Sequence, residues 1–155
     1  MQSIPNIIIP IIENGSSSNK NLRDELEDKR VIIFGVPGAF TPTCSEKHLP
    51  GFIKLYDRIR SSKIDDIYCL SVNDAFVMKA WLLSYSYKTK IKGIADGNGN
   101  ISKSLNLLID KKKYFMGMRC TRFALIANNN NIEKLFIEKT GEFVVSSAEY
   151  ILDQL

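Results

Sequence analysis

Residues 31–52 read VIIFGVPGAFTPTCSEKHLPGF, and this stretch decides the fold because it joins a buried strand to a helix that begins beside a cysteine. Its first six residues are apolar at every position, which is typical of a central strand covered on both faces. The chain then turns at Pro37-Gly38, and Thr41 is a good N-cap with Pro42 as a favoured first helical residue. Cys44 is therefore expected in the first helical turn, where free backbone N–H groups and the helix dipole favour a thiolate.

The pattern on either side of this stretch predicts alternating strands and helices. Apolar residues recur at helical spacing to about Arg60, and Pro50-Gly51 is expected to kink that helix. The other expected elements are an extended segment at 1–12, a loop at 13–20, a helix at 21–29 capped by Asn21, a strand at 67–72, a helix after Asp74 with Phe76, Val77, Ala80, Trp81 and Ser84 on one face, a strand at 92–95, a helix near 101–108, strands at 122–127 and 132–137 joined by an Asn-rich turn, and a last helix capped by Ser146 or Ser147.

This order predicts an α/β fold of the thioredoxin kind, a mixed central β-sheet flanked by helices, in a single domain spanning residues 1–155. The early alternation gives parallel neighbours with right-handed crossovers, and the late hairpin adds an antiparallel pair.

Composition narrows the possible functions. The chain has 155 residues, 45% of them hydrophobic and 25% charged, with three cysteines, one histidine and a net charge of +4. Its one lysine run is Lys111-Lys113 and other charges interleave, so nucleic-acid binding is not expected. No apolar run approaches the ~18 residues of a membrane span. No pair of cysteines or histidines has metal-ligand spacing and there is no CxxC, so we expect no metal, no cofactor and a reactive site built on one thiol.

The motif Pro37-x-x-x-Thr41-x-x-Cys44 resembles the peroxidatic-cysteine motif of the peroxiredoxins. The segments FGVPGAFTP (34–42), HLPGF (48–52), SVNDAFV (71–77) and RF (122–123) are more narrowly similar to the type-five, or atypical type II, subfamily. The similarity covers about residues 21–155.

The resemblance implies a thiol peroxidase that acts on hydrogen peroxide and small alkyl hydroperoxides. Cys44 would attack the peroxide and become a sulfenic acid. Thr41 would orient the peroxide, Arg122 would stabilise the developing negative charge, and Pro37 would shield the sulfur from water. Arg119 is the competing arginine, but Arg122 fits the family pattern because it directly precedes an apolar run.

Four further residues are expected near the site with weaker roles. His48 lies one turn after Cys44, and a supporting or capping role is favoured over catalysis. Phe115 is expected to line the substrate pocket, and Trp81 to lie in the core or the pocket wall. If residues 120–122 are extended, Cys120 shares the face of Arg122 and is expected as a thiol at the pocket rim.

Cys69 lies inside an apolar strand and is expected in the core. Residues 141–148 contain no cysteine, although many members of the subfamily carry a resolving cysteine there. The chain is thus expected to be a one-cysteine variant that needs an external thiol, with glutathione and glutaredoxin as the first candidates and a thioredoxin-like protein as the second.

The resemblance also implies a homodimer. A peroxide-sensing redox switch or interaction protein on the same scaffold is the alternative function. Residues 1–12 lack the basic region of a signal peptide and the composition of a transit peptide. The predicted compartment is a plastid or mitochondrion, after loss of a targeting extension of the kind found in similar proteins of A/T-rich protists, or else the cytoplasm.

Overall fold

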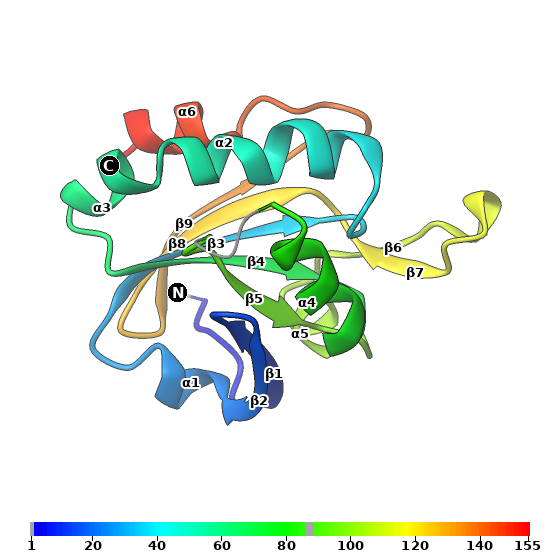
Figure 1. The fold of residues 1–155 in the computed structure, drawn as a ribbon, viewed down its shortest axis with the longest axis horizontal. Helices are drawn as coiled ribbons and strands as arrows, with labels where there is room; N and C mark the ends of the chain where they lie inside the picture. Colours follow the sequence, from blue (N-terminus) through cyan, green and yellow to red (C-terminus); the bar gives the residue numbers. More distant parts are fainter. Residues whose placement is uncertain (1, 86–88) are drawn as a thin grey trace.

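A computed structural model describes residues 2–85 and 89–155, and its backbone forms a mixed β-sheet with helices on both faces (Figure 1). No helix in these ranges has the length and apolar character needed to cross a membrane. The elements in chain order are β1 (Ile8–Glu13), β2 (Ser16–Asn21), α1 (Leu22–Glu25), β3 (Arg30–Val36), the π-helix η1 (Cys44–His48), α2 (Leu49–Lys54), α3 (Tyr56–Ser61), β4 (Asp66–Ser71), α4 (Ala75–Leu83), β5 (Lys92–Ala95), α5 (Asn100–Ser104), β6 (Leu108–Asp110), the 3₁₀ turn η2 (Lys112–Tyr114), β7 (Met118–Cys120), β8 (Phe123–Asn128), β9 (Asn131–Ile137) and α6 (Ala148–Asp153).

The main sheet has seven strands in the order β2-β1-β5-β4-β3-β8-β9. β3 pairs in parallel with β4, and β4 in parallel with β5, as the alternation of strands and helices predicts. β8 pairs antiparallel with both β3 and β9, so the predicted hairpin is confirmed. The predicted α/β class with a mixed sheet is therefore correct, and β3 lies between two other strands.

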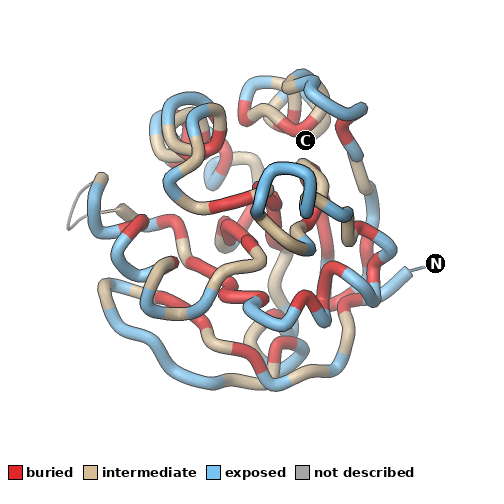
Figure 2. Tube along the Cα trace, turned by 90° about the vertical axis from the view of Figure 1, so that its right-hand side faces the viewer, coloured by how far each residue is buried: buried red, intermediate tan, exposed pale blue. Residues whose placement is uncertain are grey.

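Successive residues of β3 alternate between two separate cores, which explains why the strand is apolar throughout. Ile32, Phe34 and Val36 pack with α2, α3, α4 and α6 on one face. Val31 and Ile33 pack with α1, α5 and part of β8 on the other. Figure 2 shows these buried segments running through the middle of the molecule, with exposed chain around them.

The N-terminal quarter differs from the prediction. Residues 13–20 were expected as a loop, but β2 forms an antiparallel hairpin with β1 at the edge of the sheet. The turn between them uses Asn14 and Gly15, both with positive φ. β2 consists only of Ser, Asn and Lys, and it can be polar because most of its side chains are exposed. The extended segment expected at 1–12 is correct for β1, while Met1 lies outside the described residues. α1 ends at Glu25, earlier than predicted, although Asn21 caps it by accepting from the Asp24 N–H at 3.1 Å.

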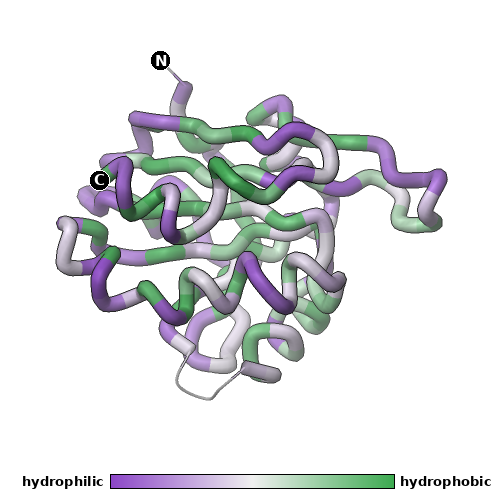
Figure 3. Tube along the Cα trace, turned by 90° about the horizontal axis from the view of Figure 1, so that it is seen from above, coloured by the Kyte–Doolittle hydropathy of each residue, from purple (hydrophilic) through white to green (hydrophobic). Residues whose placement is uncertain are grey.

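A short two-stranded arm was also missed. The helix predicted at 101–108 ends at Ser104, and Leu108 instead begins β6, which pairs antiparallel with β7. The arm extends away from the body of the molecule (Figure 1), and Figure 3 shows hydrophilic and hydrophobic stretches alternating along it. Only three residues of each strand pair, so no long periodic pattern marked them.

The helical region after β3 is less regular than predicted. Its first part is the π-helix η1, in which the Leu49 N–H donates to the Cys44 carbonyl five residues back. The helix continues through Pro50 and Gly51, and the interruption lies at Leu55, between α2 and α3. The expected kink at Pro50-Gly51 is thus replaced by a widened turn before the proline, which has no N–H to continue the normal ladder. The face expected for the helix after Asp74 is wrong at Phe76, Ala80 and Ser84, which are exposed, Phe76 by 86%. The buried side chains of α4 are Met78, Trp81 and Leu82.

Candidate active site

Cys44 lies where the chain leaves the carboxyl end of β3 and enters the helix. The Ser45 N–H donates to the Thr41 carbonyl at 2.9 Å, so the helix begins where the Thr41-Pro42 pattern predicts. The Thr41 hydroxyl, however, donates to the Gly38 carbonyl at 2.7 Å and makes no capping bond to the helix. Cys44 itself is 1% exposed, so its side chain is buried.

The next residue, Ser45, is tied to α4 and to the segment after it. The Trp81 indole N–H donates to Ser45 Oγ at 3.0 Å, and the Tyr85 hydroxyl donates to the Ser45 carbonyl at 2.6 Å. Trp81 is buried and therefore belongs to the core. These bonds fix the first helical turn against the domain and so hold Cys44 in place.

Arg122 is the charged group nearest the sulfur among the described contacts. It stands directly before β8, and its Nη2 atom lies 3.2 Å from Cys44 Sγ. Its Nη1 atom donates to His48 Nδ1 at 2.9 Å, and its guanidinium carbon lies 5.7 Å from the centre of the Phe143 ring. Arg119 points elsewhere, to the carbonyls of Met116 and Val72. The contacts with Cys44, His48 and the Phe143 ring fix the orientation of the Arg122 guanidinium.

His48 is a buried, neutral link in this arrangement. Burial first, and then the nearby Arg122 charge, lower its pKa from 6.5 to about 3. Because a guanidinium only donates, Nδ1 must accept from Arg122, which places the ring proton on Nε2. That Nε2–H donates to the Ser146 carbonyl at 2.8 Å. His48 thus connects the arginine to the segment before α6.

Glu138 holds that segment in turn. One carboxylate oxygen accepts from Val144 N at 2.6 Å, Ser146 N at 3.0 Å and Ser146 Oγ at 2.7 Å. Burial alone would raise the pKa of Glu138, but these hydrogen bonds outweigh it and hold the pKa below its usual value. Sequence reasoning missed Glu138, Phe143 and Ser146, since no local motif marks contacts made across the end of the sheet.

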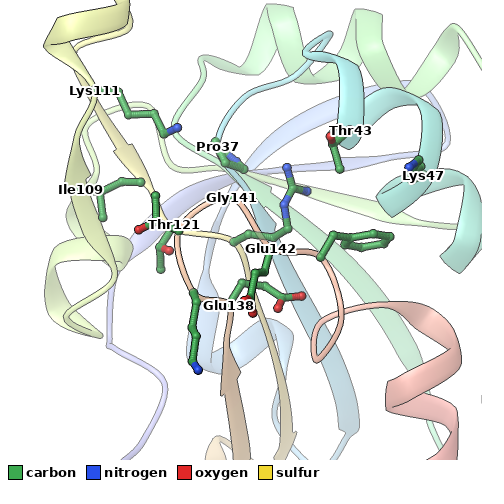
Figure 4. Close-up of a pocket in the computed structure, with 13 residues that line it drawn as sticks. Pro37, Thr43, Lys47, Ile109, Lys111, Thr121, Glu138, Gly141 and Glu142 are labelled. Carbon is green, nitrogen blue, oxygen red and sulfur yellow. The ribbon is translucent and has the colours of Figure 1, made fainter.

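A cavity of about 350 Å³ opens next to Arg122 (Figure 4), and Cys44 is not among the residues that line it. Pro37, Thr43 and Arg122 form part of its wall. Phe115 was expected to line the pocket, but it lies in the β6–β7 arm and is fully exposed, so that prediction is wrong for this chain. The positive φ of Phe115 marks it as part of a tight turn.

The other two cysteines are buried thiols. Cys69 is fully buried in β4, as predicted, and burial raises its pKa. Cys120 was expected at the pocket rim but is also fully buried, and its Sγ donates to the Val36 carbonyl at 3.0 Å. Burial raises its pKa to about 12. The prediction failed because β7 ends at Cys120, so residues 120–122 are not one continuous strand. Within residues 2–85 and 89–155, no cluster of three metal-ligating side chains occurs.

Comparison with known proteins identifies the family of the chain. The family model Redoxin matches residues 2–152. Peroxiredoxin-2D of Arabidopsis thaliana is 46% identical over 143 residues, which is 92% of this chain and 88% of that protein. The reduced Prx3 of Vibrio vulnificus in complex with H₂O₂ is 38% identical with a TM-score of 0.92, covering 99% of this chain and 96% of the other. The Plasmodium falciparum antioxidant protein, described as a 1-Cys peroxiredoxin, is 36% identical with a TM-score of 0.91, covering 99% and 95%. The fold is thioredoxin-like, and the chain belongs to the peroxiredoxin family of thiol peroxidases.

Proposed function

We propose that the protein reduces hydrogen peroxide and small alkyl hydroperoxides through a thiolate on Cys44, which becomes a sulfenic acid. The observation that carries this proposal is the distance of 3.2 Å between Arg122 Nη2 and Cys44 Sγ. Cys44 lies in the first turn of a helix at the carboxyl end of a central strand. A guanidinium is always charged, and beside a sulfur in this position it stabilises a thiolate. It also stabilises the negative charge that develops on the departing peroxide oxygen.

In the reaction, Cys44 Sγ attacks one peroxide oxygen, the O–O bond breaks, and the other oxygen departs as hydroxide or alkoxide. Arg122 is placed to donate to that departing oxygen, together with free N–H groups of the first helical turn. The Thr41 hydroxyl donates its hydrogen bond to the Gly38 carbonyl, so the hydroxyl oxygen can accept a hydrogen bond from the peroxide. Pro37 lines the cavity and offers no donor of its own, which suits a role in shielding the sulfur.

His48 acts as a positioning residue in this proposal. It is neutral, accepts from Arg122 and donates to the Ser146 carbonyl, so it supplies orientation and no proton at neutral pH. Because the arginine side chain has many rotamers, the hydrogen bond from one guanidinium nitrogen to His48 keeps the other nitrogen next to the Cys44 sulfur.

We assign the chain to a one-cysteine variant of the type-five subfamily. No cysteine lies in residues 141–148, and both other cysteines are buried. The relationship to the Plasmodium protein described as a 1-Cys peroxiredoxin supports this assignment. Oxidised Cys44 then requires an external thiol, for which glutathione with glutaredoxin is the first candidate and a thioredoxin-like protein the second. A homodimer, and a plastid, mitochondrial or cytoplasmic location, remain predictions.

The test is peroxide consumption by the purified protein with each thiol system in turn. We expect wild-type turnover with glutathione and glutaredoxin, loss of turnover in Cys44→Ser, and retained turnover in the matched control Cys120→Ser. Turnover in Cys44→Ser would overturn the assignment of the nucleophile. Rapid oxidation of Cys44 without recycling by either thiol system would instead favour the alternative function of a peroxide sensor.

A further inference from the structure

The loop of residues 37–41, which connects β3 to the helix of Cys44, has a strained backbone. Phe40 in this loop has a φ of 64°, in the left-handed region that is unfavourable for a residue with a Cβ atom. Its side chain is 57% exposed, so packing of the ring does not hold the residue in this conformation. A strained conformation persists only where the surrounding structure holds it, and such residues cluster at functional sites. Contacts with neighbouring elements must therefore hold the loop.

The position of this loop sets the position of the Thr41 hydroxyl. That hydroxyl donates to the Gly38 carbonyl at 2.7 Å, and the Thr41 N–H donates to the same carbonyl at 3.4 Å. Both bonds lie within the loop, so the hydroxyl moves with Gly38 when the loop moves. In the proposed reaction the Thr41 oxygen accepts a hydrogen bond from the peroxide, so a shift of the loop displaces this acceptor.

Asn73 holds the loop from the carboxyl end of β4. The Ala39 N–H donates to Asn73 Oδ1 at 3.0 Å. The same oxygen accepts from the Ser71 hydroxyl at 2.5 Å, and Ser71 is fully buried as the last residue of β4. A buried residue of the sheet thus holds the Asn73 amide in one orientation, and the amide oxygen in turn holds the loop at the residue after Gly38.

Arg119 packs against the same loop from β7. Its Nη1 donates to the Val72 carbonyl at 3.3 Å and its Nε to the Met116 carbonyl at 2.8 Å, so it ties the β6–β7 arm to the segment that follows β4. A Cβ atom on Gly38 would lie 3.2 Å from this Nη1 and 3.1 Å from Thr41 Cγ2. Gly38 therefore allows the loop to lie closer to Arg119 than a residue with a Cβ atom would.

We propose that Asn73 and Arg119 are positioning residues for the reaction with peroxide. They hold the loop of residues 37–41 so that the Thr41 oxygen meets the peroxide, and they act through this loop and not through the acidity of Cys44. The proposal rests on the proposed peroxidase function, in which Thr41 orients the peroxide. A displacement of about 1 Å in a group of this kind is enough to slow a reaction about 100-fold.

This role separates two properties of the site that can be measured independently. Arg122 lies against Cys44 Sγ and stabilises the thiolate. Within residues 2–85 and 89–155, neither Asn73 nor Arg119 forms a hydrogen bond with Cys44. Their loss is therefore expected to slow the reaction with peroxide, which uses the Thr41 oxygen. It is not expected to slow an alkylating agent, which needs only an accessible thiolate.

The experiment compares two reactions of Cys44 in Asn73→Ala and Arg119→Gln. Oxidation by hydrogen peroxide is followed by stopped flow through the fluorescence of Trp81, the single tryptophan, which bonds to the residue next to Cys44. Alkylation by iodoacetamide is followed as a function of pH, with the modified cysteine located by mass spectrometry. The pH profile of alkylation gives the midpoint of thiolate formation, and urea unfolding gives the stability of each variant.

The matched controls replace the same residue types on exposed surface. They are Asn19→Ala on β2 and Arg58→Gln on α3. Ser71→Ala is a milder variant that removes only the hydroxyl bonded to the Asn73 amide, and it keeps the proposal testable if Asn73→Ala does not fold. Each substitution is also combined with Thr41→Val, which lacks the acceptor oxygen.

We expect the rate constant with peroxide to fall about tenfold in Asn73→Ala and in Arg119→Gln, and about threefold in Ser71→Ala. The rate constant of alkylation is expected to stay within about twofold of wild type, with the same midpoint of thiolate formation. In the Thr41→Val protein the same substitutions are expected to slow peroxide oxidation by less than about twofold, because the effects of residues that act through one another are not additive. The controls are expected to match wild type in both reactions.

The proposal is overturned if the folded variants react with peroxide within about twofold of wild type. It is also overturned if alkylation slows in parallel with oxidation, since the residues would then act on the thiol itself, or if the full loss persists beside Thr41→Val. If Cys44 of the wild-type protein is not oxidised by peroxide, the proposed function fails and this proposal fails with it. Normal oxidation of wild type without a selective loss in the variants overturns the positioning role alone.

Discussion

Burial of His48 makes the stability of the folded protein depend on pH between the unperturbed pKa of histidine and its lowered pKa in the folded state. His48 is the one histidine of the chain. Its pKa is about 3 in the folded protein, against 6.5 when unperturbed. Between these two values the unfolded chain binds a proton at His48 that the folded chain does not, so stability falls as the pH falls. From pH 7 to pH 5, linkage with these two pKa values gives a loss of about 2 kcal/mol in the free energy of unfolding.

Urea unfolding under reducing conditions, at pH 7 and pH 5, measures this loss. Asp and Glu side chains of the unfolded chain titrate mainly below this window, which isolates the histidine. His48→Gln removes the titrating ring, so we expect it to be less stable than wild type at pH 7 but nearly equally stable at both pH values. A wild-type change below about 0.5 kcal/mol, or an equal change in the variant, would refute the view of a neutral His48 that accepts from Arg122.

Three further predictions concern Arg122, Glu138 and Gly35. Arg122→Lys keeps the positive charge but loses the guanidinium group that contacts both Cys44 and His48. The rate constant of Cys44 oxidation by peroxide, measured by stopped flow, is therefore expected to fall about 100-fold. A rate constant within threefold of the wild-type value would contradict this prediction. Glu138→Gln is expected to lower the free energy of unfolding by about 1–3 kcal/mol at pH 7. Since the pKa of Glu138 is lowered in the folded protein, its contribution to stability is present above pH ~4.5 and is lost as the pH falls through the folded pKa. The free energies of unfolding of wild type and Glu138→Gln are therefore expected to converge in acid. A difference that persists in acid would contradict the role of the Glu138 carboxylate. Gly35→Ala places a methyl group into the Phe123 ring and is expected to cost about 2–3 kcal/mol in urea unfolding, whereas a loss below about 0.5 kcal/mol would show that the ring can move aside.

The core of the fold was predictable because its strands carry strong signals. β3 is apolar at every position after Arg30, and β4 has a continuous run without charged or small polar residues at Ile67–Leu70, which indicates burial on both faces. The hairpin of β8 and β9 was marked by two apolar runs around asparagines, and Asn129 and Asn130 take positive φ in its turn. β2 could not be predicted in the same way, since its polar residues lie on an exposed edge and form a strand only by pairing with β1.

The site was predictable to the extent that its residues lie in local motifs. The strand, turn and helix around Cys44 could be derived from the chain itself, and the family pattern pointed to Arg122, which contacts the sulfur in the structure. Cys120 was misplaced because β7 ends at that residue, and Phe115 because it lies at the exposed turn of the β6–β7 arm, which no sequence pattern marked. The bonds from Glu138 to the segment before α6 join residues by tertiary packing, so no spacing in the sequence marks them.

The central claim is that Cys44 alone is the peroxide-reactive thiol, although all three cysteines are free and buried. Treatment of the reduced protein with less than one equivalent of hydrogen peroxide in the presence of dimedone traps sulfenic acids, and peptide mass spectrometry locates them. The dimedone adduct is expected on Cys44, with none on Cys69 or Cys120, whose pKa values burial raises. An adduct distributed over all three cysteines, or one absent from Cys44, would contradict the account.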